Sequence, residues 1–242
     1  MRMERGLLAN RLRSTHATVV LSARASTSIN SVDRQNCGVA PMVPRKMRLS
    51  IEDIRNRILT CKKCETMNAG QRRVPGVGVL TPSVFFVGEA PGRLGADKTG
   101  VPFTLDRSGK LLEEMMRMIG LSTHRDVYIS NVVKCNPRSE SGRNRHPSIE
   151  EIENCREHLL AELEVIEPRI LVPLGKLASD QLLGLGKCMR QISGHMSAHE
   201  SYGSVLPLYH PGYVVRGNYT VDRYRQDFRR LKKLLKEKTL SS

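Results

Sequence analysis

The sequence predicts an α/β fold in which helices cover both faces of a parallel sheet. Four short apolar segments with strand character alternate with helical segments, and such alternation is typical of parallel sheets. One of these segments, Ser83–Val87 (SVFFV), is almost wholly apolar, as expected for a strand buried on both faces. The chain has 242 residues, of which 39% are hydrophobic, so it can bury a core in one domain of roughly 200 residues.

The first predicted helix and strand precede a tight turn. Ser50 suits a helix N-cap and Asp53 the third helical position, and apolar residues at 51, 54, 58 and 59 share one helical face. This helix leads into Cys61. The strand Ser83–Val87 then stops at Gly88-Glu-Ala-Pro-Gly92, where two glycines and a proline predict a turn.

The rest of the chain repeats this alternation. An amphipathic helix over 109–119 stops at Gly120, and a long helix over 147–164 starts near Ser148 with two glutamates in its first turn. We expect further strands over 127–133, 170–174 and 205–209, and further helices over 176–183 and 224–236.

Residues 1–46 differ in composition from the rest of the chain. They hold eight Lys or Arg and two acidic residues, they are rich in Ser, Thr and Asn, and no apolar period persists in them. We predict that this basic extension is disordered or docks only partly, and that one folded domain occupies 47–242. The extension also resembles an organelle transit peptide, and Met42 or Met47 could be the true start.

The net charge indicates a polyanionic partner. The chain carries 39 Lys or Arg against 24 Asp or Glu, a net charge of +15, and residues 47–242 alone keep +9. Nucleic acid is the first candidate, and a merely basic or ribosome-associated protein is the alternative. No apolar run approaches the ~18 residues that a membrane-spanning helix needs. With no Trp and 4% aromatic residues, DNA binding built mainly on rows of stacked aromatics is disfavoured.

Four of the six cysteines have spacing that suits a metal site. Cys61 and Cys64 form a C-x2-C pair, Cys135 follows after 70 intervening residues, and Cys155 after 19 more. Four thiolates can hold zinc or a [4Fe–4S] cluster, and the spacing does not choose between them. Cys37 and Cys188 have no such partners. Six cysteines are too few for a disulfide scaffold, so we expect a reducing compartment.

Three predicted strands end in polar residues, where parallel sheets gather functional groups. Glu89 lies in the turn after the first strand, Asn131 near the end of the second, and His210 closes the fourth. The amide of Asn131 could read one edge of a pyrimidine, and a neutral His210 could donate a hydrogen bond to a developing anion. The alternatives are an ordinary loop, a satisfied core amide and a structural histidine.

Seven sequence blocks, in order, resemble the iron–sulfur family 4 of uracil-DNA glycosylases. They are CKKC, VGEAPGRLGADKTGVPF, RSGKLL, YISNVVKCNP, NRHPSIEEIENC, ILVPLGKLA and LYHPGYVVRG, and they span the chain from about Leu49 to Leu235. The resemblance implies a three-layer α/β/α fold with a central four-stranded parallel sheet. It also implies a narrow pocket that receives one uracil flipped out of DNA, and cleavage of its N-glycosidic bond in base excision repair.

The resemblance also assigns roles to residues. It implies a [4Fe–4S] cluster held by Cys61, Cys64, Cys135 and Cys155. It places Glu89 and Ala90 at the glycosidic bond, in a turn bounded by Gly88 and Gly92. In the best-known glycosylase family an aspartate stands at the position of Ala90, so a simple aspartate-activated water is in doubt here. Phe103 is expected to stack on uracil, Asn131 to read O4 and N3–H, and His210 to donate to O2.

The same resemblance implies how DNA is held. The loop Pro211–Arg216, including Val215, is expected to enter the minor groove, and Lys62 and Lys63 to face phosphates. We expect a monomer that acts on double- or single-stranded uracil-containing DNA, with no membrane partner. The expected location is the nucleoid in the cytoplasm, unless the extension targets an organelle.

Two other functions remain open at this point. His146, in the turn Asn144-Arg145-His146-Pro147, stands where a related class of protein carries a histidine that traps uracil-DNA covalently. The second alternative is a non-enzymatic nucleic-acid-binding module stabilised by zinc or a cluster. That module would explain the charge and the cysteines but not the polar ends of the strands.

Overall fold

A computed structural model describes residues 49–64, 70–184 and 186–240. The predicted extension over 1–46 and Cys37 lie outside this part of the chain, so both interpretations stay predictions. Within the described ranges, no helix has the length and apolar character needed to cross a membrane.

The centre of the fold is a mixed sheet of six strands in the order β1-β3-β2-β4-β6-β5. The four inner strands are parallel, as predicted, and they pair in register from Val84 to Val127 on one side and to Ile170 on the other. The inner strands are β3 (Val127–Asn131), β2 (Val84–Gly88), β4 (Ile170–Pro173) and β6 (Gly203–Val205). The prediction missed the antiparallel edges, β1 (Val77–Gly78) and β5 (Ser197–His199), because these strands are short and carry no apolar run.

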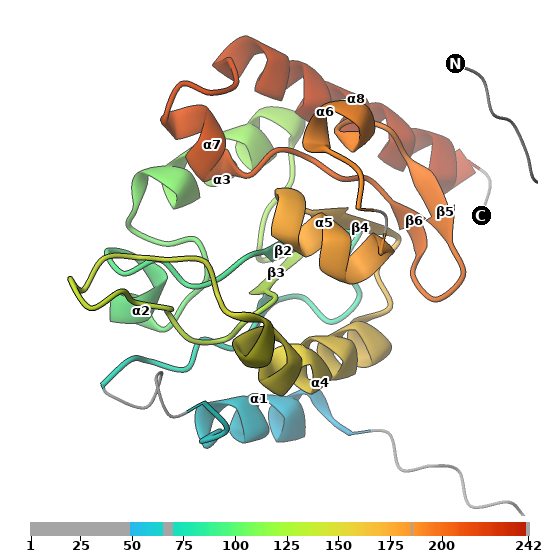
Figure 1. The fold of residues 1–242 in the computed structure, drawn as a ribbon. Helices are drawn as coiled ribbons and strands as arrows, with labels where there is room; N and C mark the ends of the chain where they lie inside the picture. The colour runs from blue at the N-terminus through green and yellow to red at the C-terminus, as the bar shows by residue number, and fades with distance from the viewer. Residues whose placement is uncertain (1–48, 65–69, 185, 241–242) are drawn as a thin grey trace, which may run out of the picture. The chain divides into compact units, whose positions relative to one another are not determined.

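Helices cover both faces of the sheet, so the three-layer arrangement is confirmed (Figure 1). Along β2, Val84 and Phe86 join the core on one face, and Phe85 and Val87 join the core on the other, because successive strand residues point to opposite sides. The first core contains α3 (Arg107–Ile119), α7 (Pro211–Val215) and α8 (Val221–Leu240). The second contains α4 (Ile149–Ile166) and α5 (Lys176–Leu183), with α1 (Ile51–Leu59) against α4. Two short helices, α2 (Ala96–Thr99) and α6 (Met189–Ile192), lie outside the prediction.

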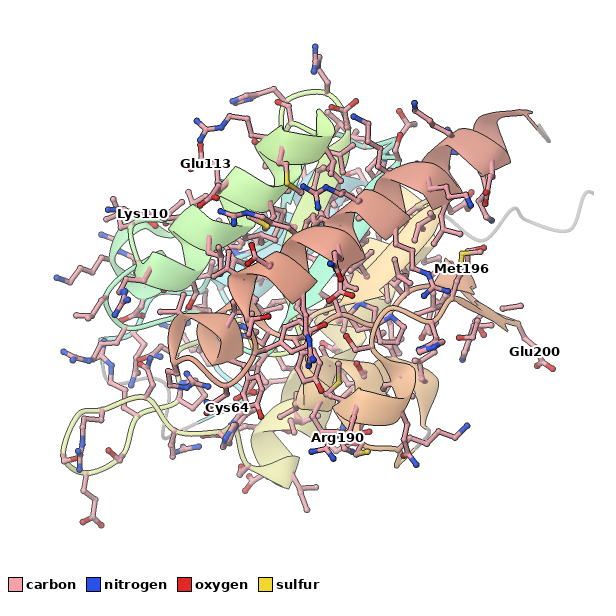
Figure 2. The ribbon with its side chains drawn as sticks, turned by 90° about the horizontal axis from the view of Figure 1, so that it is seen from above. Cys64, Lys110, Glu113, Arg190, Met196 and Glu200 are labelled. Carbon is pink, nitrogen blue, oxygen red and sulfur yellow. The ribbon has the colours of Figure 1, made fainter. Side chains whose placement is uncertain are left out.

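The predicted helix boundaries are largely confirmed by their caps. Ser50 and Ser148 each form a capping box, in which the serine and the third helical residue bond each other's backbone N–H. The helix α3 begins earlier than predicted, because Asp106 caps it, and it ends at Gly120 in the left-handed conformation that glycine favours. Its polar face, with Lys110 and Glu113, points outward (Figure 2).

Three predicted segments differ from the structure. The strand predicted over 127–133 ends at Asn131, because the chain there turns toward the cysteine region. The strand predicted over 205–209 lies earlier, as β6, and continues only through a single bridge between Leu174 and Leu208. The loop predicted over Pro211–Arg216 is the helix α7, since Pro211 suits the first helical position after the His210 N-cap.

Candidate active site

A polar pocket lies where the carboxyl ends of β2 and β3 meet the segment before α7. This is the edge at which parallel α/β sheets usually bind ligands. Residues separated by more than 100 positions in the sequence meet here, because neighbouring parallel strands end at the same edge. The lining includes Glu89, Ala90, Pro91, Gly92, Phe103, Asp106, Ser108, Asn131, Asn136, Pro137, Asn144, Arg145, His146, His210, Gly212 and Arg216.

Asn131 presents a buried acceptor to the pocket. The residue ends β3 and is 1% exposed, and its Oδ1 atom receives no hydrogen bond from any residue in the described part of the chain. Its main chain is fixed, because the ammonium of buried Lys134 donates to the Asn131 carbonyl oxygen at 2.7 Å. An unsatisfied amide oxygen in such a place costs about 1–3 kcal/mol, so a ligand N–H is the expected partner.

Phe103 lies beside Asn131 because Gly88 leaves room for both. A Cβ atom on Gly88 would approach Asn131 Oδ1 to 2.4 Å and the Phe103 ring to 2.7 Å, so this position admits only glycine. Phe103 itself has a φ of 52°, a left-handed conformation that is costly for an aromatic residue. Such strain at a pocket wall fits a ring held in place for a ligand. Gly92 has a similar constraint, since a Cβ there would lie 2.7 Å from Asp106 Oδ2.

His210 is held as a neutral imidazole whose outer nitrogen is a donor. The Gly212 backbone N–H donates to His210 Nδ1 at 3.0 Å, so in the neutral ring the proton is on Nε2. Burial, together with the nearby Arg216 guanidinium, lowers the pKa of His210 to about 4. The ring centroid lies 5.6 Å from that of Phe103. The imidazole is therefore a neutral hydrogen-bond donor at neutral pH.

The Glu89 carboxylate contacts a histidine side chain at the pocket. Its Oε1 atom lies 2.7 Å from Nδ1 of His146, which comes from a loop 57 positions later. Glu89 is one-quarter exposed, whereas the His146 side chain is 87% exposed. The family resemblance placed Glu89 at the site, whereas His146 was considered only for the alternative of covalent trapping, and nothing in the sequence indicated that the two residues contact each other.

The loop before α4 is held rigid by side chains that the sequence analysis did not assign to the site. Asn136 Nδ2 donates to the Pro91 carbonyl at 2.7 Å and to Asn144 Oδ1 at 3.0 Å, which joins this loop to the turn after β2. Arg145 makes a bidentate pair with Glu151 at 2.5 and 2.7 Å and donates to the His146 carbonyl at 2.9 Å. In the sequence, the polar run between Cys135 and Pro147 was the feature that could have indicated these residues. These contacts fix where His146 lies.

Several residues predicted to bind DNA lie outside the pocket. Pro211 is buried, and Val215 packs partly against the first core, so Tyr213 and Arg216 are the side chains that α7 and its C-cap expose most. Lys63 is on the surface and forms an ion pair with Glu157 at 2.9 Å. Lys62 is exposed beside it.

The four predicted cluster ligands line one small cavity between α1, α4 and the segment after β3. The Lys134 backbone N–H donates to Cys155 Sγ at 3.2 Å, and Asn154 Nδ2 donates to Cys64 Sγ at 3.7 Å. Burial, with a smaller contribution from the charge of Cys155, raises the pKa of Cys135 to about 12. Burial also raises the pKa of Cys155 to about 11, although the Lys134 ammonium and its backbone N–H oppose the increase. Within the described ranges, no three His, Cys, Asp or Glu side chains converge on a point as a metal-ion site requires.

A polar pocket at the carboxyl ends of β2 and β3 in a three-layer α/β/α fold is typical of α/β proteins that bind or process a small ligand group, and comparison with known sequences identifies the family. A model described as "Uracil DNA glycosylase superfamily" matches residues 75–236. The chain belongs to this superfamily.

Within the superfamily, several curated relatives are named type-4 uracil-DNA glycosylase. The Archaeoglobus fulgidus protein of that name is 37% identical over 196 residues, which cover 78% of this chain and 95% of the relative. The Thermotoga maritima one is 36% identical over 167 residues, 69% of this chain and 83% of the relative. A type-5 uracil-DNA glycosylase of Pyrobaculum aerophilum is 31% identical over 210 residues, 74% of this chain and 91% of the relative.

Proposed function

We propose that the chain removes uracil from DNA by hydrolysing its N-glycosidic bond, which leaves an abasic site for base excision repair. The observation that carries the proposal is the unpartnered, buried Oδ1 atom of Asn131 in a pocket shared with Phe103 and His210. Uracil offers an N3–H donor beside its O4 acceptor, which matches the oxygen and the NH2 group of one amide. Names of the relatives support the same activity.

The pocket supplies groups that act on the uracil and groups that act on the sugar when the N-glycosidic bond breaks. The target base is hidden inside a duplex, so the nucleotide must be flipped out, at a cost of a few kcal/mol. The N1–C1′ bonding electrons leave with uracil, and the Nε2–H of His210 stabilises the negative charge at O2. Water adds hydroxide to C1′, and its proton is released, in the end, to the uracil anion. Glu89, positioned by His146, is the carboxylate available to stabilise the cationic sugar and orient that water.

An oligonucleotide with a single uracil tests the proposal. Wild-type protein should release uracil and leave an alkali-labile site, whereas matched oligonucleotides with cytosine or thymine should stay intact. A denaturing gel run without alkali also tests covalent trapping through His146, because a heat-stable shifted band would replace the free product. If neither an abasic product nor a heat-stable shifted band formed, the non-enzymatic binding module would be the remaining interpretation.

Replacing Asn131 by aspartate should weaken uracil excision by about 1–3 kcal/mol in kcat/KM. An ionised aspartate repels uracil O4 and offers no donor, while it can accept from the exocyclic amine of cytosine. The ratio of uracil to cytosine excision should therefore fall. A loss of uracil excision in proportion to a lower melting temperature, with no gain on cytosine, would show that Asn131 is only structural.

We infer that Cys61, Cys64, Cys135 and Cys155 hold a [4Fe–4S] cluster. The four cysteines line one cavity, and the resemblance of the surrounding sequence to the iron–sulfur family favours a cluster over a zinc ion. Two donated N–H···S bonds fit thiolates that carry charge in a buried place. When bound, the cluster would tie the segments around α1, β3 and α4 together, and it would have no part in bond cleavage.

Cys135→Ser should remove most of the bound iron from protein purified without oxygen and bleach its brown colour, because metal binding is coupled to folding. Cys188→Ser is the matched control, since Cys188 is exposed and far from the other four in sequence. Iron and sulfide analysis measures the effect. A colourless wild-type protein with one zinc per chain would overturn the cluster assignment.

Binding to undamaged DNA should weaken steeply with salt, because each phosphate neutralised by Lys or Arg adds nearly one to the log–log slope. The net charge of +9 on residues 47–242 predicts that several phosphates are contacted. Deleting residues 1–46 should lower the slope but leave excision intact. A folded truncated protein without excision would place part of the site in the extension.

A monomer working on DNA in the nucleoid is the simplest form of this proposal. Lys62, Lys63 and Arg216 are exposed cations that can reach phosphates, while the buried Pro211 is less suited to enter a groove. Any targeting role of the extension remains a prediction.

A further inference from the structure

One exposed aromatic side chain beside the pocket has no role in the chemistry above. Tyr213 lies on α7 and is 39% exposed, although its neighbours Gly212 and Val214 are buried. The same short helix begins at His210, so Tyr213 is fixed relative to the uracil pocket.

Two further tyrosines support the Tyr213 ring from behind. The Tyr213 and Tyr209 rings are stacked with centroids 5.4 Å apart and an angle of 10°, and Tyr209 stacks in turn on Tyr219 at 4.3 Å. The Tyr219 hydroxyl donates to Asp227 of α8 at 3.0 Å. An aromatic stack anchored in this way loses little freedom when a flat ligand docks on it.

Tyr209 and Tyr213 line a groove that adjoins the uracil pocket, since His210 lines both. The other lining residues are Gly175, Lys176, Cys188, Met189 and Arg190. The two tyrosine rings and the Met189 side chain give the groove apolar and aromatic surface, which suits the face of a nucleobase.

The rim of the groove is positive. Arg190 is exposed on α6 (Figure 2), and within the described residues it has no ion pair. Lys176 pairs with Asp180, one turn further along α5. Among the residues that the structure describes, no Asp or Glu lines the groove itself, so its charged lining residues, Lys176 and Arg190, are both cations.

We propose that this groove binds the nucleotide next to the flipped uracil, with its base stacked on Tyr213 and its phosphate near Arg190. The inference rests on the proposed function and extends it. When one nucleotide leaves the stack, its neighbour loses a stacking partner, and an aromatic side chain can replace that partner. DNA is favoured over a protein occupant because the groove adjoins the uracil pocket at His210 and its rim charge complements phosphate.

The test uses the full chain and an oligonucleotide whose uracil nucleotide carries a 2′-fluorine that blocks cleavage. The fluorescent base 2-aminopurine stands next to the uracil, on the 5′ side in one probe and on the 3′ side in the other. Wild-type protein should change the fluorescence of one of the two probes on binding. Y213L should abolish that change and weaken binding about 5- to 100-fold, whereas Y213F should keep both.

Control variants separate stacking from other effects. Y202L removes a tyrosine that stacks on His199 at the far β5–β6 hairpin, and it should leave fluorescence and affinity unchanged. R190Q should lower the salt slope by about one and keep the fluorescence change. A folded Y213L protein with wild-type affinity and fluorescence would overturn the proposal, and would leave the groove to a protein partner.

Failure of the proposed function has a different signature. In that case wild-type protein would not excise uracil from the unmodified oligonucleotide at all. If wild-type protein excises uracil and neither probe responds, only the groove assignment is wrong.

Discussion

Replacing His210 by alanine is expected to lower the single-turnover rate of uracil excision about 10²–10³-fold while changing DNA affinity little. This is the effect of removing one positioned donor from a developing anion. The donor is prepared before substrate arrives, because Gly212 N–H occupies Nδ1 and leaves the proton on Nε2. Since the pKa of His210 is lowered to about 4, its ionisation should not reduce the rate between about pH 5 and 8.

Single-turnover rates and melting temperatures, measured on the same preparations of His210→Ala, show whether His210 acts in catalysis or only stabilises the fold. His124→Ala is the matched control, because His124 is exposed in a turn away from the pocket, and this variant should excise uracil normally. If His210→Ala lost rate only in proportion to lost stability, the residue would be structural. A stable His210→Ala protein with unchanged excision would remove His210 from the mechanism.

Lys134→Met is expected to lower the free energy of unfolding by about 3–5 kcal/mol, because it leaves the buried carboxylate of Glu162 without its counter-ion. Lys134 and Glu162 are 1% and 0% exposed, and Nζ lies 2.7 Å from Oε2. Both carboxylate oxygens of Glu162 accept further hydrogen bonds, since the Ser130 hydroxyl donates to Oε2 at 2.6 Å and the Gly76 N–H donates to Oε1 at 2.8 Å.

This ammonium also joins the two sites. Its donation to the Asn131 carbonyl holds the residue that we propose reads uracil, and the backbone N–H of Lys134 donates to Cys155 Sγ. Chemical denaturation gives the free energy, and the double variant Lys134→Met/Glu162→Leu should recover part of the loss. Lys233→Met, in an exposed pair with Glu237 on α8, should cost no more than about 1 kcal/mol. A Lys134→Met protein as stable as Lys233→Met would show that the buried pair contributes little.

Local patterns were enough to place most elements. The capping serines Ser50 and Ser148 start their helices as predicted, because a cap is a contact between residues three positions apart. Buried parallel strands such as β2 are also visible in sequence, since both faces must be apolar. The edge strands were missed because two or three exposed residues carry no such pattern, and α7 because Pro-Gly indicates a turn as readily as a helix start.

Apolar periodicity, turn residues and motif spacing are local properties, and they were enough to predict the parallel sheet, the position of Asn131 at a strand end and the spacing of the four cysteines. His210 lies five residues beyond the end of β6, so its place in the pocket depends on the segment that leads into α7. The contact of Glu89 with His146, the pairing of Lys134 with Glu162 and the stacking of three tyrosines beside His210 became visible in the folded molecule. These contacts join separate elements, so they depend on how the strands and helices pack and on which side chain the remaining space admits.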